Sequence, residues 1–340
     1  MSNIIVDTKA ILEIKDLHTV FHTDEGTVRA ADGVSYAVRP GETLAVVGES
    51  GSGKSVTAMS VLQLIPQPPG EIVSGAVYFR GEDLTAVSRR RMQEIRGNRI
   101  AMIFQEPMTS LNPVHTIGKQ IMEPMLLHGT QDRSNARRRA VDLLRRVGIP
   151  AAEQRMSEYP HQLSGGMRQR VMIAIALACE PEVLIADEPT SALDVTVQLQ
   201  ILRLLKDLQE QLGMAVILIT HDLGVVAEVA DRVAVMYAGR VVEMGTVGEI
   251  FRNSVHPYVA GLRASIPDLE EEVDRLSVIP GQVPNAANLP TGCPFAPRCP
   301  AVMERCTTED PSATLVGDPQ PGVGQEVHLV RCWLNQGVPV

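Results

Sequence analysis

The residues Gly48-Glu49-Ser50-Gly51-Ser52-Gly53-Lys54-Ser55 fit the pattern G-x-x-x-x-G-K-[ST] of a phosphate-binding loop. The apolar run Thr43–Val47 before it is typical of a buried strand, and a helix is predicted after it from Ser55 to Leu64. Glycines let the backbone amides turn towards phosphate oxygens, and the helix start adds its positive dipole end. Lys54 can pair with the β- and γ-phosphates, and the Ser55 hydroxyl can ligate Mg²⁺. The loop therefore predicts an α/β nucleotide-binding fold rather than a flexible Gly/Ser linker.

Two acids follow a second apolar run, Val183-Leu184-Ile185-Ala186-Asp187-Glu188. Four consecutive apolar residues are typical of a buried strand, and open α/β sheets bind ligands at the carboxyl ends of their strands. There Asp187 would hold Mg²⁺ through water, and Glu188 would polarise the attacking water as a general base. Two adjacent acids after a strand are often only a surface turn, but the phosphate loop in the same chain favours the catalytic interpretation.

A third element, Leu163-Ser164-Gly165-Gly166-Met167, precedes an apolar helix. Ser164 can cap that helix, and the two glycines leave the amides at its start open to an anion. One nucleotide needs only one phosphate loop. A second phosphate-facing helix start therefore favours a dimer, in which the helix closes over the nucleotide held by the other subunit. A plain Ser-Gly-Gly turn is the alternative when this element is considered alone.

Charge and hydropathy exclude several other classes of protein. The formal net charge is −9, which disfavours a nucleic-acid binder, because phosphate backbones require a basic surface. No apolar run reaches the ~18 residues that span a bilayer, and residues 1–10 lack the apolar core of a signal peptide. We therefore expect a soluble chain that binds no nucleic acid and acts at a membrane only through partners.

Hydrophobic periodicity predicts a mixed α/β order along most of the chain. Alternating residues over 11–47 predict antiparallel strands, further strands are expected at Val77–Arg80 and Ile100–Phe104, and residues 114–160 are expected to be helical with a solvated arginine face. From 167 to 245 helices and strands are expected to alternate. The runs at 183–186, 215–220 and 233–237 are apolar on both faces, as strands of a parallel sheet covered by helices must be.

Four of the five cysteines stand within the last fifty residues, in a segment rich in proline. Their spacing is C-x5-C-x6-C-x25-C, whereas structural zinc sites usually pair ligands about two to four residues apart. From this spacing alone a [4Fe–4S] cluster is favoured, while zinc and no metal remain open. Cys179 lies in a separate apolar run and is expected to be a buried free thiol. The expected ligands are Cys293, Cys299, Cys306 and Cys332.

Taken in order, these motifs resemble those of the ABC transporter ATPases over about residues 11–250. Residues 48–55 are similar to the Walker A motif, and residues 183–188 to Walker B with its catalytic glutamate. Residues 163–167 are similar to the signature motif, with Met167 in place of the usual glutamine. The resemblance further implies that Phe21 stacks on adenine and that Gln105 is the Q-loop glutamine that senses Mg²⁺ and water. It also implies that Asp194 is the aspartate of the D-loop Ser191–Asp194 and that His221 is the switch histidine.

The same resemblance implies an enzyme that hydrolyses ATP to drive transport. ATP and Mg²⁺ are the implied cofactors, with Ser55, Gln105 and Asp187 around the metal and Val56 at the nucleotide. A module that binds nucleotide without turnover is disfavoured, because both Glu188 and His221 are present. A soluble ABC ATPase of DNA repair or translation is the other alternative, and the acidic charge and single cassette disfavour it.

The C-terminal segment resembles the corresponding region of ATPases that serve oligopeptide and dipeptide importers. The resemblance rests on His256-Pro257-Tyr258 and on residues 292–300, and it spans about residues 254–335. That group includes [4Fe–4S] proteins. It also includes nickel and some sugar importers, so peptides are the expected cargo while nickel and sugars stay open.

The resemblance finally implies an architecture and a set of partners. The expected fold is an α/β P-loop NTPase core of RecA type over residues 11–253, with an antiparallel β subdomain and a helical signature subdomain at about 106–165. Residues 254–340 are expected to form a small irregular cysteine domain. The implied partners are a second ABC ATPase subunit, expected to be a paralogue, two transmembrane permease subunits and an extracytoplasmic substrate-binding protein. The chain would then lie peripherally at the cytoplasmic face of the inner membrane.

Overall fold

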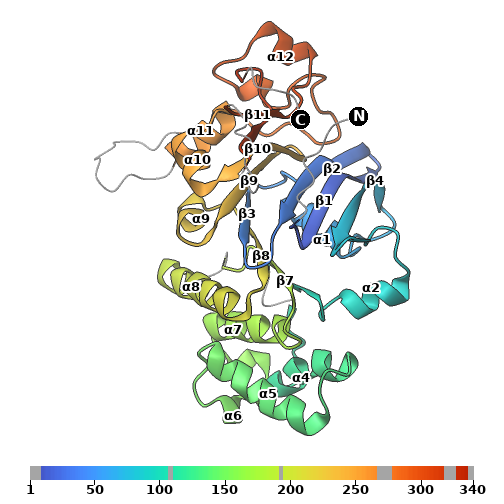
Figure 1. Ribbon diagram of the computed structural model, residues 1–340, viewed down its shortest axis with the longest axis vertical. Coiled ribbons are helices and arrows are strands. Elements are labelled where there is room, and N and C mark those ends of the chain that lie inside the picture. Colours follow the sequence, from blue (N-terminus) through green and yellow to red (C-terminus); the bar gives the residue numbers. More distant parts are fainter. Residues whose placement is uncertain (1–8, 106–109, 191–193, 266–277, 318–326, 336–340) are drawn as a thin grey trace. The chain divides into compact units, whose positions relative to one another are not determined.

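The chain divides into two units, and each of them contains both strands and helices. The computed structural model describes residues 9–105, 110–190, 194–265, 278–317 and 327–335 (Figure 1). The first unit contains residues 1–37, 43–85 and 220–340, and the second contains residues 38–42 and 86–219. Both units mix helices with strands, which confirms the α/β class predicted from the sequence.

An antiparallel sheet in the first unit contains the strands expected near the N-terminus. Its strand order is β2-β1-β4-β5, with bounds Gly26–Val38, Leu12–Thr23, Gly70–Phe79 and Glu82–Asp83. β1 pairs antiparallel with β4, in a register that places Phe21 opposite Gly70. Helix α1 (Lys54–Val61) contacts β1, and it begins at the phosphate loop as the sequence predicted.

A second sheet of the first unit contains the strand that leads into the phosphate loop. β3 (Thr43–Val47) pairs parallel with β9 (Arg232–Tyr237), so it does not continue the antiparallel pattern of the strands before it. β9 pairs antiparallel with β10 (Arg240–Thr246), and β10 with β12 (Leu329–Val330). β11 (Thr314–Leu315) pairs with β12. The C-terminal segment therefore extends the same sheet that positions the phosphate loop.

Short helices cover this sheet and carry the segment rich in cysteine. They are α9 (Leu223–Val229), α10 (Val247–Arg252), α11 (Pro257–Ala264), the 3-10 turn η2 (Ala296–Arg298) and α12 (Glu304–Thr308). One hydrophobic core joins β3 and β9 to α11 and to Phe295, with Cys293 and Cys299 packed against it. The prolines of this segment limit helix length, as the sequence indicated, and packing on the sheet replaces long helices.

The second unit contains a parallel sheet and a set of antiparallel and crossing helices. β6 (Ile100–Ile103), β7 (Val183–Asp187) and β8 (Ala215–Thr220) pair parallel, and β7 is buried along its whole length. α7 (Gly165–Ala176) packs on α4 (Ile117–Leu127) and α5 (Arg133–Arg146), as Figure 1 shows. The remaining elements of this unit are α2 (Arg89–Ile95), α6 (Ala152–Arg155), η1 (Pro160–Gln162) and α8 (Val195–Leu212).

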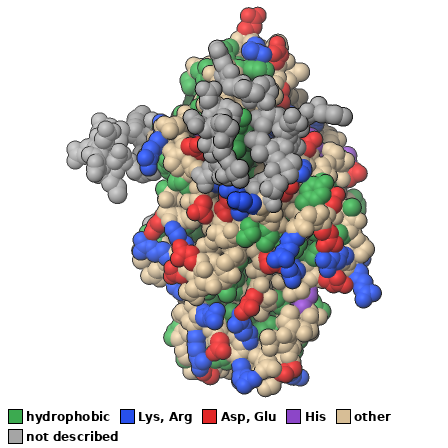
Figure 2. Space-filling view, viewed as in Figure 1, with side chains coloured by type: hydrophobic (Ala, Val, Ile, Leu, Met, Phe, Trp, Pro, Cys, Tyr) green, Lys and Arg blue, Asp and Glu red, His purple; other side chains and the backbone are tan. Residues whose placement is uncertain are grey.

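The arginines of α5 lie on a solvated face, as predicted. Ala136, Ala140, Val141, Leu143 and Leu144 form the buried stripe of this helix. Arg139 pairs with Glu180, and Arg145 with Asp142 and Glu153. Both signs of charge are interspersed over this helical part in Figure 2. Among the described helices, none has the length and hydropathy needed to cross a lipid bilayer.

Candidate nucleotide site and cysteine cavity

The phosphate loop has a backbone that only glycine can follow at its first position. Gly48 has a φ of 155°, and a Cβ atom there would lie 2.2 Å from the carbonyl oxygen of Met236 on β9. The loop is therefore pressed against the neighbouring strand, which fixes its path. Lys54 is buried, and its Nζ donates to the carbonyl oxygens of Gly48 (2.7 Å) and Glu49 (3.0 Å). Its ammonium group thus lies within the curve of the loop, where phosphate oxygens would be bound.

The other predicted nucleotide contacts of the first unit lie on separate elements. Ser55 and Val56 lie in the first turn of α1 and are partly exposed. Phe21 is half-buried near the end of β1, where Gly70 leaves room for its ring. His221 is exposed, directly before Asp222, which caps α9 by accepting from the amides of Gly224 and Val225. The structure leaves the expected roles of these side chains as predictions.

In the second unit the strand ends bring Gln105, Asp187 and Glu188 to one edge. β6 and β7 are parallel neighbours, so the residues that follow them emerge together. Gln105 Nε2 donates to Glu188 Oε2 at 2.9 Å. Asp187 is buried, and Glu188 is held by its amide, which donates to the carbonyl oxygen of Ile219 on β8 at 2.9 Å. The arrangement places a general-base candidate, its amide partner and a metal-ligand candidate at the site expected from the sequence.

Glu188 also has an unusual backbone. Its φ is 44°, in the left-handed region that residues with a Cβ rarely occupy. Such a conformation costs about 1–3 kcal/mol and is typical of residues at functional sites. Glu180 and Ala238 have similar φ values, so the conformation of Glu188 supports its assignment only together with its place at the end of β7.

The predicted signature element starts α7 as the sequence indicated. Ser164 is the N-cap residue, and its Oγ accepts from the amide of Met167 at 3.4 Å. Ser164 and Gly165 are exposed, so the amides at the helix start are open to a partner. Arg168 and Arg170 anchor the helix on the helical part of the unit through the carbonyl oxygens of Pro160 (2.7 Å) and Val147 (2.6 Å).

The predicted D-loop is described only at its last residue. Ser191, Ala192 and Leu193 lie outside the described residues. Asp194 is exposed and caps α8, with its Oδ1 accepting from the amide of Val197 at 3.0 Å. This cap accounts for the aspartate in purely local terms.

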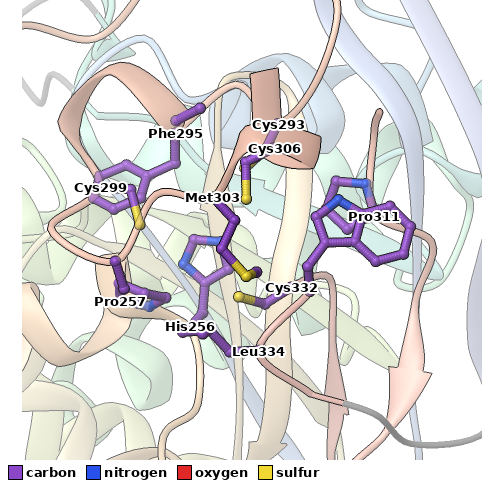
Figure 3. Close-up of a pocket in the computed structure, with 13 residues that line it drawn as sticks. His256, Pro257, Cys293, Phe295, Cys299, Met303, Cys306, Pro311, Cys332 and Leu334 are labelled. Carbon is purple, nitrogen blue, oxygen red and sulfur yellow. The ribbon is translucent and has the colours of Figure 1, made fainter. Parts of the chain in front are cut away.

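The four C-terminal cysteines line one cavity, which Figure 3 shows. They come from the turn before η2, the turn after it, helix α12, and the residues that follow β12. The rest of the lining is mostly apolar and includes Phe295, Met303 and Trp333. Among the described residues, no group of three or more His, Cys, Asp or Glu side chains is placed to hold a metal ion. The structure thus gathers the predicted ligands without assembling a site for a single ion.

The apolar lining of the cavity disfavours charged side chains. Burial raises the pKa of the Cys293 and Cys299 thiols, and it raises the pKa of Cys332 to about 11. A thiol whose pKa is raised above its ordinary value is neutral at physiological pH, and a bound metal ion would favour loss of its proton.

His256 lines this cavity and has a ring nitrogen, Nε2, without a hydrogen-bond partner among the described residues. The ring lines the cavity and is buried, and burial lowers its pKa to about 4, so it is neutral. Its Nδ1 accepts from the amide of Tyr258 at 3.1 Å, which leaves the proton on Nε2. Nε2 is buried without a hydrogen-bond partner among the described residues. A buried donor without a partner is costly, so it indicates a place for an acceptor.

Cys179 lies apart from this cavity. It is half-buried rather than fully buried, and its thiol lies 3.9 Å from Thr130 Oγ1. Burial raises the pKa of this thiol, in part offset by the Thr130 hydroxyl. Cys179 lies in the turn that follows α7, at the end of the apolar run, which is why it is less enclosed than the run suggested.

Two residues beside the phosphate loop were missed by the sequence analysis. Arg298 pairs with Glu49, and Tyr258 accepts a hydrogen bond from the amide of Glu49. The available signal was Glu49 itself, an acid in a loop that binds phosphates, because a nearby cation would offset its charge there. The partner lies 249 positions away, which no local pattern reveals.

Comparison with known proteins gives two family matches along the chain. Residues 31–191 match the family model described as ABC transporter, and residues 242–306 match the model described as oligopeptide/dipeptide transporter, C-terminal region. The dimeric ATP-binding cassette MJ0796, in a post-hydrolysis state bound to ADP and Pi, is 29% identical with a TM-score of 0.62. That likeness covers 69% of this chain and 98% of the cassette.

Two relatives that align over nearly their whole length are more than 50% identical to this chain. Oligopeptide transport ATP-binding protein AppD of Bacillus subtilis (strain 168) is 54% identical over 96% of this chain and 97% of its own. A probable peptide ABC transporter ATP-binding protein, y4tR of Sinorhizobium fredii, is 51% identical over 96% of each chain. With the phosphate loop, the paired acids and the signature helix in place, the chain belongs to the ABC transporter family, among the ATP-binding proteins that carry the oligopeptide/dipeptide transporter C-terminal region.

Proposed function

We propose that this chain hydrolyses ATP as one half of a dimer and thereby drives uptake of peptides through membrane subunits. The observation that carries the proposal is the edge where Gln105 contacts Glu188 beside Asp187, in a chain whose phosphate loop encloses Lys54. The relatives named for oligopeptide and peptide transport support peptides over nickel or sugars as cargo. The dimeric cassette of similar fold supports the paired arrangement.

Each predicted residue has a role in this proposal. Lys54 and the amides of residues 48–56 bind the triphosphate of ATP, and Phe21 stacks on the base. Ser55, Gln105 and Asp187 are the residues that would hold Mg²⁺, and the bound ion would supply charge neutralisation for phosphoryl transfer. Glu188 accepts the proton of the attacking water, and His221 lies by the γ-phosphate. Ser164, Gly165 and Gly166 of this chain would close over the ATP held by the partner subunit, and Asp194 would lie at the dimer contact.

The proposal includes a domain division and a set of partners. Residues 11–253 form the ATPase domain with its helical part at about 106–165, and residues 254–340 form the importer-type extension. The partners are a second ATPase, expected to be a paralogue, two permease subunits and an extracytoplasmic substrate-binding protein. The ATPase then lies peripherally at the cytoplasmic face of the inner membrane. The names of the peptide-importer relatives support these partners.

A reconstituted transporter tests the proposal. The chain is co-expressed with candidate permease subunits and a second ATPase, purified and placed in liposomes with a substrate-binding protein. We expect uptake of labelled peptides that depends on ATP and stops in the Glu188→Gln variant. Uptake of nickel or a sugar in place of peptides would contradict the proposed cargo. Failure to co-purify with any permease would contradict the role in transport.

We also propose that the cysteine cavity holds a [4Fe–4S] cluster. Two features support the fit: four thiols surround one apolar cavity, and His256 offers a hydrogen-bond donor there without a partner. Thiolates on a single zinc ion lie about 4 Å from one another, given Zn–S bonds of about 2.3 Å, whereas a cluster needs ligands spread around a larger body. The wide spacing of the four cysteines along the chain supports the cluster, and zinc is the alternative.

The cluster would have a structural part in this protein. Phosphoryl transfer moves no electron, so hydrolysis does not require it. Bound to the four cysteines, it would fix a segment whose prolines prevent long helices. The donor of His256 would then have a sulfur acceptor, which removes the cost of its burial.

A further inference from the structure

Glu49 of the phosphate loop forms a two-point ion pair with Arg298. Arg298 Nη1 lies 2.8 Å from Glu49 Oε2, and Nη2 lies 3.2 Å from Oε1. The Arg298 side chain is 5% exposed and that of Glu49 28%, so water screens the pair only partly. Arg298 is the last residue of η2, in the turn between Cys293 and Cys299. The pair therefore joins the phosphate loop to the segment that carries the cysteines.

The negative charge of the Glu49 carboxylate disfavours phosphate binding by the loop. The loop binds a triphosphate, and a free carboxylate beside it would repel that anion. Arg298 neutralises this charge and holds it in one place. The pKa of Arg298 is raised, chiefly by its hydrogen bonds to Glu49, which is the direction expected of a strong pair.

Contacts with Pro280, Tyr237 and Phe295 hold the Arg298 side chain in place. Its Nε donates to the carbonyl oxygen of Pro280 at 2.9 Å, and its Nη1 lies 3.3 Å from Tyr237 Oη. Its guanidinium lies 5.8 Å from the ring centre of Tyr237 and 5.9 Å from that of Phe295. A guanidinium held in this way presents its fork in a fixed direction, so little freedom is lost when it binds Glu49.

The main chain of Glu49 is tied to the same C-terminal segment. Its amide donates to Tyr258 Oη at 2.9 Å, and Tyr258 is fully buried on α11. Tyr258 packs against Tyr237 and Phe295, with ring centres 4.7 Å and 5.4 Å away. The carbonyl oxygen of Glu49 accepts from Lys54. The side chain, amide and carbonyl of Glu49 thus have three different partners, two of them from residues 256–298.

We propose that Arg298 is a positioning residue of the nucleotide site: it neutralises and orients Glu49, so that ATP binds tightly only while the segment at 293–306 is folded against the phosphate loop. The first part needs no metal. The link to the cysteine segment rests on the proposed function of the cysteines, because whatever holds Cys293 and Cys299 holds the turn between them.

The test is a double-mutant cycle on ATP binding to the full-length chain. The dissociation constant of ATP is measured for Arg298→Ala, Glu49→Gln and the double variant, with circular dichroism to confirm folding. We expect Arg298→Ala to raise this constant about tenfold or more, since coupling of close charge pairs reaches such values. In the Glu49→Gln background the same change should cost less than about threefold, because no carboxylate is left to repel the phosphates. Arg263→Ala, a change of an exposed arginine on α11, is the matched control and should bind ATP as the parent does.

The outcomes separate the possible roles of Arg298. If Arg298 only helps the segment to fold, its removal will weaken ATP binding equally in both backgrounds, and this result would overturn the proposal. Unchanged ATP binding in Arg298→Ala would overturn it as well. For the cysteine link, Cys299→Ser should weaken ATP binding at least threefold, and an unchanged dissociation constant would overturn that link. Iron content of the parent chain is measured in parallel, so absence of a cluster is distinguished from absence of the Arg298 effect.

Discussion

Gln105 donates a hydrogen bond from its side-chain amide to the carboxylate of Glu188, with 2.9 Å between Nε2 and Oε2. The two residues follow the parallel neighbours β6 and β7, so the pairing of the strands brings them together. An amide in this place neither takes the proton of the carboxylate nor neutralises its charge. Glu188 therefore remains able to act as a base while its orientation is fixed.

The first prediction concerns this carboxylate. Glu188→Gln should retain ATP binding and lower ATP hydrolysis by about a hundredfold or more, because an amide cannot accept the proton of the attacking water. The rate of phosphate release by the assembled transporter measures the effect. Glu180→Gln, on an exposed acid before β7, is the control and should hydrolyse ATP normally. A near-parental rate in Glu188→Gln would show that another group is the base.

The second prediction concerns the dimer. Ser164→Arg places a large side chain at the exposed start of α7, where the γ-phosphate of the other subunit's ATP would bind. We expect ATP to bind normally to the phosphate loop of the variant chain. Hydrolysis at the partner's site should fall on the order of a hundredfold, as when an amide donor to a developing charge is lost.

Nucleotide binding to the isolated subunit and hydrolysis by the assembled transporter separate these two effects. Ser157→Arg, another exposed serine of the helical part, is the matched control. Loss of nucleotide binding by the isolated Ser164→Arg subunit would count against a site shared between subunits.

The third prediction concerns the cysteines. Chain purified without oxygen should be brown and contain about four iron atoms, the content of one [4Fe–4S] cluster. Serine at Cys293, Cys299, Cys306 or Cys332 should remove colour and iron, because each thiol lines the same cavity. Serine at Cys179, which lies elsewhere, should remove neither. One zinc and no iron in the anaerobic protein would replace the cluster with a zinc site.

The fourth prediction concerns stability and pH. Burial tends to raise the pKa of Asp32, but its hydrogen bond and charge interaction with Arg240, and the charges of His18 and Arg29, outweigh burial and lower it below 3.8. A lowered pKa in the folded state stabilises the protein above the unfolded pKa, and this stabilisation is lost as the pH falls through the folded value. Asp32→Asn should therefore destabilise the protein by about 1–3 kcal/mol near pH 7.

Urea unfolding measured from pH 7 to pH 3 checks this prediction. The difference between parent and variant should be constant down to about pH 5 and shrink below about pH 4, where Asp32 of the unfolded chain takes up a proton before Asp32 of the folded chain does. Asp24→Asn, in the exposed turn between β1 and β2, should leave stability unchanged. A difference that persists undiminished at pH 3 would mean that packing, not charge, is responsible.

The sequence by itself determined the fold class, the family and the main motifs of the site. Residues 48–55 and 183–188 carry their meaning locally, because a phosphate loop and an acidic strand end need fixed residue types at fixed spacing. The helix that starts at Gly165 and the strands β7 and β8 were predicted from the same kind of local pattern. Length and periodicity placed the helical stretch between 114 and 160, although not its division into α4, α5 and α6.

Only the tertiary structure decided how distant segments meet. The parallel pairing of β3 with β9, the addition of β12 to β10, and the bond from Arg298 to Glu49 all join residues far apart in the chain. Such contacts depend on chain topology and on side-chain geometry, which have no period in the sequence. The same is true of the cavity that gathers four cysteines around the buried donor of His256. The number and spacing of the thiols can be read from the sequence, whereas the fold of η2, α12 and the residues after β12 brings the thiols to one cavity.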